Sequence, residues 1–331
     1  MHMPTTPRGP EIFWAPAVPD DAVTLADLFN AIGSFDETPE RTSPETMAHE
    51  LAAYFAPLGE RTMVGRDSAG EIIGYGTVYH RPAEAAEQRI YVNIHVAPDQ
   101  RNGEVEDALT DWAVTTATDV LAGLEATDKY LCAWLYKKQE DAALRFAARG
   151  FEPVRHWWEM ERLLDSEITA SVEDGFTVVP WLSEHSDSAR LVYNAAFADH
   201  WGSTPMDPES WERLVVDSPA FRLDYSFVAI AGDDVVGYAA NEVYPEDWEA
   251  AGRSEAWIGG LGVVRDWRKR GIATALLARS MNAMKSDGID AAMIGVDSAS
   301  STGAQDLYQS AGFETRITGT TWQRRVADDL Y

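Results

Sequence analysis

The 331-residue chain contains one sequence pattern twice, and this internal repeat limits its fold more than any other feature. The Gly-Tyr pair of Glu71–Tyr79 (EIIGYGTVY) recurs 163 residues later in Asp234–Val243 (DVVGYAANEV). A second landmark, with an aromatic residue, a glycine and a phenylalanine, recurs at an offset of 162 residues, in Leu144–Phe151 and Leu307–Phe313. The chain therefore carries two copies of one folding unit, as its length also favours at roughly 100–200 residues per domain.

Between these landmarks, both copies place an apolar strand before a polar turn. The strands are Ile90–Val96 and Trp257–Val264, and Arg101 and Arg268 follow them. A helical pattern with a leucine eight residues after the arginine comes next in both copies. Each copy thus predicts a strand, two helices, three strands, a helix, a strand, a helix and a final strand pair. This order predicts an α/β fold with a mixed sheet in each copy.

The second copy shows these elements most clearly. Its expected segments are Phe176–Pro180, Ser188–Phe197, Asp207–Asp217, Tyr225–Ala231, Val235–Val243, Ala256–Val264, Ile272–Lys285, Ala291–Val296, Ser301–Ser310 and Phe313–Arg325. The polar stretch Leu164–Glu173 (LDSEITASVE) separates the copies. We therefore expect an N-terminal domain at 1–167 and a C-terminal domain at 168–331.

Charge and composition exclude several function classes. Asp and Glu (54) exceed Lys and Arg (27), giving a net charge of −27 that repels nucleic-acid backbones and anionic membranes. The chain shows none of the H-E-x-x-H, C-x-x-C or G-x-x-x-x-G-K-[ST] spacings that bind metals or nucleotide triphosphates. Its N-terminus lacks the apolar stretch of a secretory signal. We expect a cytoplasmic protein, monomeric or homodimeric, with no nucleic-acid, membrane or metal partner.

The most informative segment is the turn from a strand into a helix at Val263–Leu277 (VVRDWRKRGIATALL). Gly271 and Ala273 open the helix with small side chains, which let a ligand approach the backbone closely. Consecutive amides at a helix start, backed by the helix dipole, form a site for anions. Because the basic run Arg268–Arg270 precedes this helix in an acidic chain, the turn predicts a pyrophosphate site. A solvated basic turn is the structural alternative.

This turn resembles the acyl-CoA-binding motif of the GCN5-related N-acetyltransferases (GNAT), [RQ]-x-x-G-x-[GA], which Arg268–Ala273 satisfies. The second landmark of that family, L-Y-x-x-x-G-F, is similar to Leu307–Phe313. The resemblance implies acetyl-CoA as co-substrate, and a strand that splays from its neighbour to pair with the pantetheine arm. The implied cofactor-binding residues are Leu261, Gly262, Val263, Arg268, Lys269, Arg270, Gly271, Ile272, Ala273, Thr274, Ser301 and Ala304. Ser301 stands where family members often carry Asn, so one cofactor hydrogen bond differs.

The first copy departs from the family where the cofactor would bind. Glu104 and Glu106 occupy the positions of Gly271 and Ala273, and carboxylates there would repel a pyrophosphate. Phe146 also replaces the tyrosine of the second landmark. We predict that residues 1–167 form a degenerate domain that binds no acyl-CoA productively and braces the catalytic domain or walls its acceptor site.

Acyl transfer from a thioester to an amine needs a base, donors for the oxyanion and a proton for the thiolate. The resemblance implies Tyr308 as the general acid and an amide near Val263 as the oxyanion donor. Some family members keep a base at the position of Trp257, which cannot accept a proton. The sequence leaves Glu242 and Glu255 as candidates, with Glu242 favoured, and a chain of waters as a third possibility.

The sequence gives the least information about the acceptor-binding residues. His200 and Trp201 lie in the Gly/Pro-containing loop Phe197–Asp207, where they could contact substrate, although Trp201 could instead cap the core. The acidic, aromatic loop Tyr244–Trp248 could form a rim suited to a cationic amine. We expect an N-acetyltransferase that acts on a primary amine of a small molecule by direct attack in a ternary complex. A peptide or protein amine, or a non-catalytic acyl-CoA sensor, are the alternatives.

Overall fold

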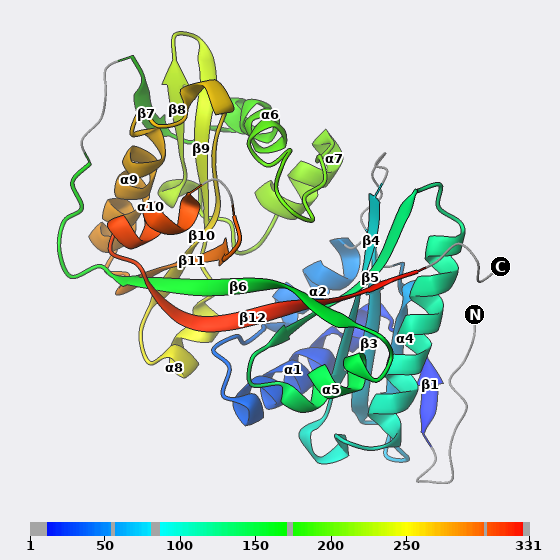
Figure 1. Ribbon diagram of the computed structural model, residues 1–331. Helices are drawn as coiled ribbons and strands as arrows, with labels where there is room; N and C mark the ends of the chain where they lie inside the picture. The colour runs from blue at the N-terminus through cyan, green and yellow to red at the C-terminus, as the bar shows by residue number, and fades with distance from the viewer. Residues whose placement is uncertain (1–11, 54–56, 81–86, 171–174, 301–302, 327–331) are drawn as a thin grey trace. The chain divides into compact units, whose positions relative to one another are not determined.

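The computed structural model describes residues 12–53, 57–80, 87–170, 175–300 and 303–326, and it divides into two compact units. The first unit holds residues 1–156 and 319–331, and the second holds residues 157–318. Figure 1 labels helices and strands of both units, and each unit has its own sheet and helices.

The first unit has a mixed sheet with helices on both faces. Its strands follow the order β1-β2-β3-β4-β5-β12, in which only β4 and β5 are parallel. These strands are β1 (Phe13–Ala15), β2 (Thr62–Arg66), β3 (Ile72–Tyr79), β4 (Glu87–Val96), β5 (Asp128–Tyr136) and the Gly319–Arg325 part of β12 (Glu314–Arg325). The helices are α1 (Ala22–Asp36), α2 (Pro44–Ala53), α3 (Leu58–Arg61), α4 (Glu104–Ala122) and α5 (Glu140–Ala147).

The second unit repeats this arrangement. Its sheet has the order β7-β8-β9-β10-β11-β6, and again the fourth and fifth strands, β10 and β11, are the parallel pair. The strands are β7 (Thr177–Pro180), β8 (Phe227–Ala231), β9 (Asp234–Glu242), β10 (Glu255–Val263), β11 (Ala291–Asp297) and the Trp157–Leu163 part of β6 (Glu152–Leu163). The helices are α6 (Ser186–Ala196), α7 (Pro208–Trp211), α8 (Trp248–Ala251), α9 (Ile272–Ser286) and α10 (Ala304–Ser310). The predicted repeat and the predicted mixed α/β fold are therefore confirmed.

The last strand of each sheet comes from the other copy of the repeat. Strand β6 follows α5 in the sequence, but its residues Trp157–Leu163 pair with β11 of the second unit. Strand β12 follows α10, but Gly319–Arg325 pair with β5 of the first unit. The compact units therefore have other boundaries than the sequence halves 1–167 and 168–331. We keep these halves as our proposal for the two copies of the repeat. Sequence patterning alone did not reveal this exchange, because both strands carry the same kind of residues.

Helices cover both faces of the second unit's sheet (Figure 1). Helix α9 turns Leu277, Met281 and Met284 toward β10 and β11, where they share one buried cluster with Tyr308 of α10. Their spacing of three or four residues is that of one helix face. On the opposite face, α6 and α7 pack around Tyr238 of β9. The predicted helix at 207–217 begins as α7 and continues as a π-helical turn, Glu212–Val216.

Candidate active site

The turn between β10 and α9 has the geometry expected of an anion site. Lys269 and Gly271 both adopt left-handed backbone conformations, with φ of 63° and 79°. Helix α9 begins at the next residue, Ile272, and the first intrahelical partner of Gly271 is the amide of Ala275. The amides at the start of a helix have no carbonyl partners within it, so they remain available to a ligand. The turn can therefore present several N–H groups to one phosphate.

The side chains of Arg268 and Arg270 in this turn make different contacts. The Arg268 guanidinium donates to the carbonyl oxygens of Val263 (Nε, 3.1 Å) and Ala196 (Nη2, 2.9 Å), so it ties the end of β10 to the end of α6. Arg270 stacks over the Trp267 ring at 4.6 Å. Because the Arg268 side chain donates to protein carbonyls, the backbone amides of the turn are the groups we propose for phosphate binding.

Strand β10 separates from β11 next to this turn. The two strands pair only through Glu255–Trp257, whereas β10 continues its ladder with β9 as far as Val263. The stretch Leu261–Val263 thus has one edge that is not paired with β11 in the described structure. A strand edge of this kind can hydrogen-bond an extended chain such as a pantetheine arm. The geometry agrees with the expected cofactor position, which we keep as a proposal.

A bulge interrupts β10 just before this open edge. The register with β9 shifts between Ile258 and Gly260, so that Gly259 is an extra residue in β10. The carboxylate of Glu242 lies against Gly259: a Cβ added there would meet Glu242 Cδ at 2.7 Å. Burial raises the pKa of Glu242, and the Tyr244 hydroxyl donates a hydrogen bond to its Oε2 at 3.1 Å. A carboxylate with a raised pKa at a strand bulge is suited to accept a proton.

Glu255, the second candidate base, has a different environment. Its side chain is only 4% exposed and accepts hydrogen bonds from Arg253 Nε (2.9 Å) and Arg316 Nη1 (2.6 Å). Two guanidinium partners hold the Glu255 carboxylate in place. We therefore keep Glu242 as the proposed base and propose a structural role for Glu255.

Tyr308, the expected acid, lies on α10 with 7% of its surface exposed. Burial raises its pKa to about 12, so the hydroxyl keeps its proton at neutral pH. Tyr308 shares a buried cluster with Ile258 of β10, and Leu261 packs against the same cluster. Tyr238 of β9 packs beneath β10, where a Cβ at Gly260 would meet its hydroxyl at 2.9 Å. The acid candidate thus lies in a cluster that includes the residue before the Gly259 bulge.

A cavity of about 270 Å³ lies between α9 and α10 of this unit. Thr274 of α9, an expected cofactor residue, lines it together with Leu307 and Ser310 of α10. Ala304 begins α10. Ser301, the remaining expected cofactor residue, lies outside the described residues. The gap between the two helices leaves room beside the phosphate turn.

The loop after α6 brings His200 and Trp201 to an aromatic cluster. Their rings lie 6.1 Å and 6.2 Å from the ring of Trp157, which comes from β6. Trp157 pairs in the sheet with Asp297, at the end of β11. The sequence analysis did not include Trp157 among the candidate contacts for the acceptor. The strand exchange is what brings it to this loop, so it joins His200 and Trp201 as a candidate contact for the acceptor.

The first unit contains the same turn in an altered form. Asn102 has a φ of 57°, as Lys269 does, but its amide donates to the Glu106 carboxylate at 2.9 Å. Arg145 of α5 forms an ion pair with the same carboxylate at 2.7 Å. Glu106 therefore occupies an amide that a phosphate would need. This arrangement agrees with the expected like-charge block at Glu104 and Glu106, and adds that Arg145 neutralises part of it.

The strand bulge is also confined to the second unit. Strands β3 and β4 pair without a shift from Gly74 and Val96 to Tyr79 and Tyr91. In the matching register Tyr79 takes the place of Glu242, since it pairs with Tyr91 as Glu242 pairs with Trp257. The first unit therefore has neither the bulge nor the candidate base, and Phe146 replaces the acid.

Two searches of the described residues gave negative findings. The part of the chain that the structure describes contains no group of three or more His, Cys, Asp or Glu arranged to hold a metal ion. None of the helices described here combines the length and apolar character that a bilayer crossing requires.

Comparisons with known proteins agree with this architecture. The model of a family described as "Acetyltransferase (GNAT) family" matches residues 187–313. Mycothiol acetyltransferase from Thermobispora bispora is 30% identical over 62% of this chain and 68% of its own length. The enzyme of the same name from Pseudarthrobacter chlorophenolicus is 26% identical, over 80% of this chain and 76% of its own.

Solved structures share the fold along almost the whole chain. A GCN5-related N-acetyltransferase from Sphaerobacter thermophilus has a TM-score of 0.73 at 22% identity, over 95% of both chains. A tandem GNAT protein from the clavulanic acid biosynthesis pathway has a TM-score of 0.71 at 15% identity, over 96% of this chain and 100% of its own. The tandem arrangement with one altered copy resembles mycothiol synthase, as the curated relatives also indicate. The chain therefore belongs to the GNAT family and is a tandem-domain N-acetyltransferase.

Proposed function

We propose that the second unit transfers an acetyl group from acetyl-CoA to a primary amine of a small molecule. The observation that carries this proposal is the Glu242 carboxylate, which lies against the Gly259 bulge beside the open edge of β10. The GNAT family uses acetyl-CoA, and the turn Arg268–Thr274 offers the amides that its pyrophosphate needs. The acetyl group passes directly from acetyl-CoA to the amine within a ternary complex.

In the proposed mechanism, Glu242 takes a proton from the acceptor ammonium, and the free amine attacks the thioester carbonyl carbon. A backbone amide near Val263 donates to the oxygen that becomes negative. As the carbon–sulfur bond breaks, Tyr308 donates its proton to the departing sulfur. The second proton lost by the attacking nitrogen restores the Tyr308 hydroxyl by way of water, and Glu242 releases its own proton to solvent. The raised pKa of Tyr308 keeps its proton in place until the thiolate develops. The base, Glu242, and the acid, Tyr308, thus act on opposite ends of the reacting group.

The acceptor site lies on the α6 side of the sheet in this proposal. His200, Trp201 and Trp157 form an aromatic wall there. The net charge of −27 favours the approach of a cationic amine. The curated relatives are named mycothiol acetyltransferases, so amines related to mycothiol belong among the first candidates. A peptide or protein amine remains the second class to test.

Release of free thiol from acetyl-CoA, measured with a panel of amines, tests this function. The panel contains small primary amines, mycothiol-related amines, polyamines and lysine peptides. We expect a small primary amine to give the highest kcat/KM. Faster turnover of lysine peptides than of every small amine would overturn the substrate class, and no amine-dependent thiol release would overturn the proposed reaction.

The variant Glu242→Gln tests the proposed base. It removes the proton acceptor and keeps the size of the side chain, so we expect kcat/KM to fall by about 10²-fold or more. Glu249→Gln removes one exposed carboxylate from the nearby helix α8 and should leave kcat/KM within about twofold. Equal effects of the two substitutions would contradict the assignment.

A further inference from the structure

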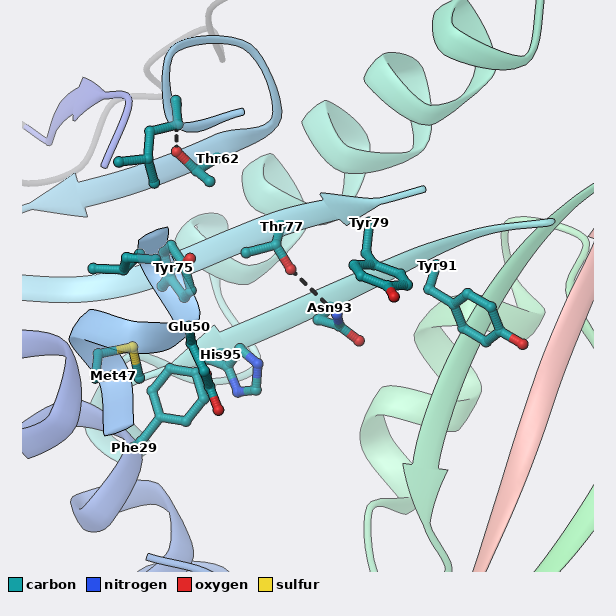
Figure 2. Close-up of a pocket in the computed structure, with 12 residues that line it drawn as sticks. Phe29, Met47, Glu50, Thr62, Tyr75, Thr77, Tyr79, Tyr91, Asn93 and His95 are labelled. Atoms are coloured by element: carbon teal, nitrogen blue, oxygen red, sulfur yellow. Dashed lines mark hydrogen bonds between the residues drawn. The ribbon is translucent and has the colours of Figure 1, made fainter. Parts of the chain in front are cut away.

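The first unit contains a cavity of about 480 Å³ in the part of the fold that corresponds to the acceptor side of the second unit. Side chains of α1, α2, α3, β2, β3 and β4 line it. Figure 2 shows Phe29, Met47 and Glu50 close to Tyr75 and His95, with Tyr79 and Tyr91 farther along the strands. A volume of this size is typical of pockets that hold small molecules.

Aromatic rings make up much of the cavity wall. The Phe29 ring lies 4.1 Å from the His95 ring and 6.1 Å from the Tyr75 ring. Farther along the strands, Tyr79 and Tyr91 lie 6.4 Å apart. The faces of such rings carry partial negative charge and attract cations. Burial lowers the pKa of His95 to about 4, so this ring stays neutral and does not repel a cation.

Glu50 supplies the one formal charge among the described residues that line the cavity. Its carboxylate forms no hydrogen bond or ion pair with any described residue, although the side chain stays accessible to solvent. Surrounding protein partly desolvates it and raises its pKa. It also raises the pKa of Tyr75, which places its charge next to that ring. A carboxylate without a cationic partner inside an aromatic pocket is stabilised when a cation binds.

This cavity is not equipped for acyl transfer. Glu106 occupies the Asn102 amide at the phosphate turn, and the bulge and base of the second unit have no counterpart in β3 and β4. Tyr79 stands at the position of the candidate base and lines the cavity instead. The first unit has therefore kept a pocket while losing the groups that would use acetyl-CoA beside it.

We propose that the cavity of the first unit binds a small organic ammonium ion, held between its aromatic rings and the Glu50 carboxylate. The ligand is a cation because the described lining offers one carboxylate, four aromatic rings, a neutral imidazole and no Lys or Arg. The site is separate from the acetyl-transfer site and needs no acetyl-CoA. Its ligand is bound and not converted.

Calorimetric titration of the full-length protein with choline and with 3,3-dimethylbutan-1-ol tests this proposal. The two probes have the same shape, but the alcohol carries a carbon in place of the charged nitrogen. Choline has no primary amine, so binding cannot be confused with acetyl transfer. At about pH 8, where carboxylates are ionised, we expect choline to bind at least about tenfold more tightly than the alcohol.

Four variants locate the site. Glu50→Gln should weaken choline binding by about tenfold, and Tyr79→Leu should weaken it by a smaller factor through the loss of one ring face. Glu45→Gln removes an exposed carboxylate from the same helix α2 and should change the affinity by less than about twofold. Glu242→Gln in the second unit should also leave choline binding unchanged.

Four results would overturn the proposal. Equal affinities for choline and the alcohol would show that charge is not recognised. Absence of choline binding up to about 10 mM would show that the cavity does not select ammonium ions, since specific sites bind more tightly than this. Unchanged binding in Glu50→Gln would remove the carboxylate from the site. Loss of binding in Glu242→Gln instead would place choline in the transfer site.

Discussion

A methyl group at Gly259 provides a sharp test of the proposed base, because it changes the position of Glu242 without changing its chemistry. The Cβ of an alanine at residue 259 would lie 2.7 Å from Glu242 Cδ and 2.8 Å from Oε2. Carbon atoms rarely approach closer than about 3.4 Å, so the carboxylate has to move by roughly 0.7 Å or more. The backbone at residue 259 is not in the left-handed region, and it accepts an alanine without strain.

This displacement sets the expected size of the effect. A shift of about 1 Å in a catalytic group can cost about 10²-fold in rate, which corresponds to about 2.7 kcal/mol in the activation free energy. The clash involves only the end of a flexible side chain. We therefore expect Gly259→Ala to lower the free energy of unfolding by about 1 kcal/mol or less. A large loss of kcat/KM with a small loss of stability is the predicted combination.

The assay compares kcat/KM for acetyl transfer across a range of pH with the Tm of the same protein samples. Because burial raises the pKa of Glu242, the wild-type kcat/KM should fall with decreasing pH at higher pH values than an ordinary carboxylate would produce. Gly259→Ala should alter this acidic limb. Gly295→Ala is the matched control, since an alanine Cβ on β11 meets no atom within 4 Å there.

Two results would refute the reasoning. The first is a Gly259→Ala enzyme with wild-type kcat/KM and an unchanged pH profile, because the carboxylate would then not need its observed position. The second is an equal loss of activity in Gly295→Ala, because the effect would then come from any added methyl group in the sheet.

Three further outcomes follow from the structure. Tyr308→Phe should lower kcat by about 10²-fold with a Tm change of only a few degrees, and an unchanged kcat would remove the tyrosine as the acid. Glu255→Gln should lower the free energy of unfolding by about 1–3 kcal/mol, as measured by urea denaturation, because it removes the charge that two arginines bind. Loss of the acidic limb of the pH profile in this variant would instead identify Glu255 as the base. Glu106→Ala should lower stability by about 1–3 kcal/mol, since it leaves Arg145 and the Asn102 amide without this partner. Gain of acetyl-CoA binding by the first unit is not expected, because Glu104 still stands at the position of Gly271. Unchanged stability would contradict the role of Glu106 in closing the turn.

The repeated strand order and the phosphate turn could be predicted from the sequence because they depend on local patterns. These patterns occur at fixed spacings in the sequence. They are apolar strands, a small residue at a helix start, and a glycine such as Gly271 that adopts a left-handed conformation. The splayed edge of β10 was expected from the family resemblance, and the β10–β11 ladder does end at Trp257.

Other parts of the site depend on contacts between distant residues. The sequence favoured Glu242 over Glu255 but did not show the partners of Glu255, because one of them, Arg316, is 61 residues beyond it. It did not place Gly259 in a bulge, because one extra residue in a strand cannot be told from a longer loop. The Glu50 cavity was also missed, since its lining comes from six separate elements.

The exchange of β6 and β12 has a consequence for the order in which the chain can fold during synthesis. Strand β5 obtains its second neighbour only from Gly319–Arg325, which are synthesised after β11 and α10 of the second unit. The sheet of the first unit therefore stays incomplete until most of the second unit has been made, and until then β5 has an open edge. Such an edge can pair with another chain. A nascent polypeptide halted near residue 168 would present β5 without β12 and β6 without β11, and would be a natural target for chaperones.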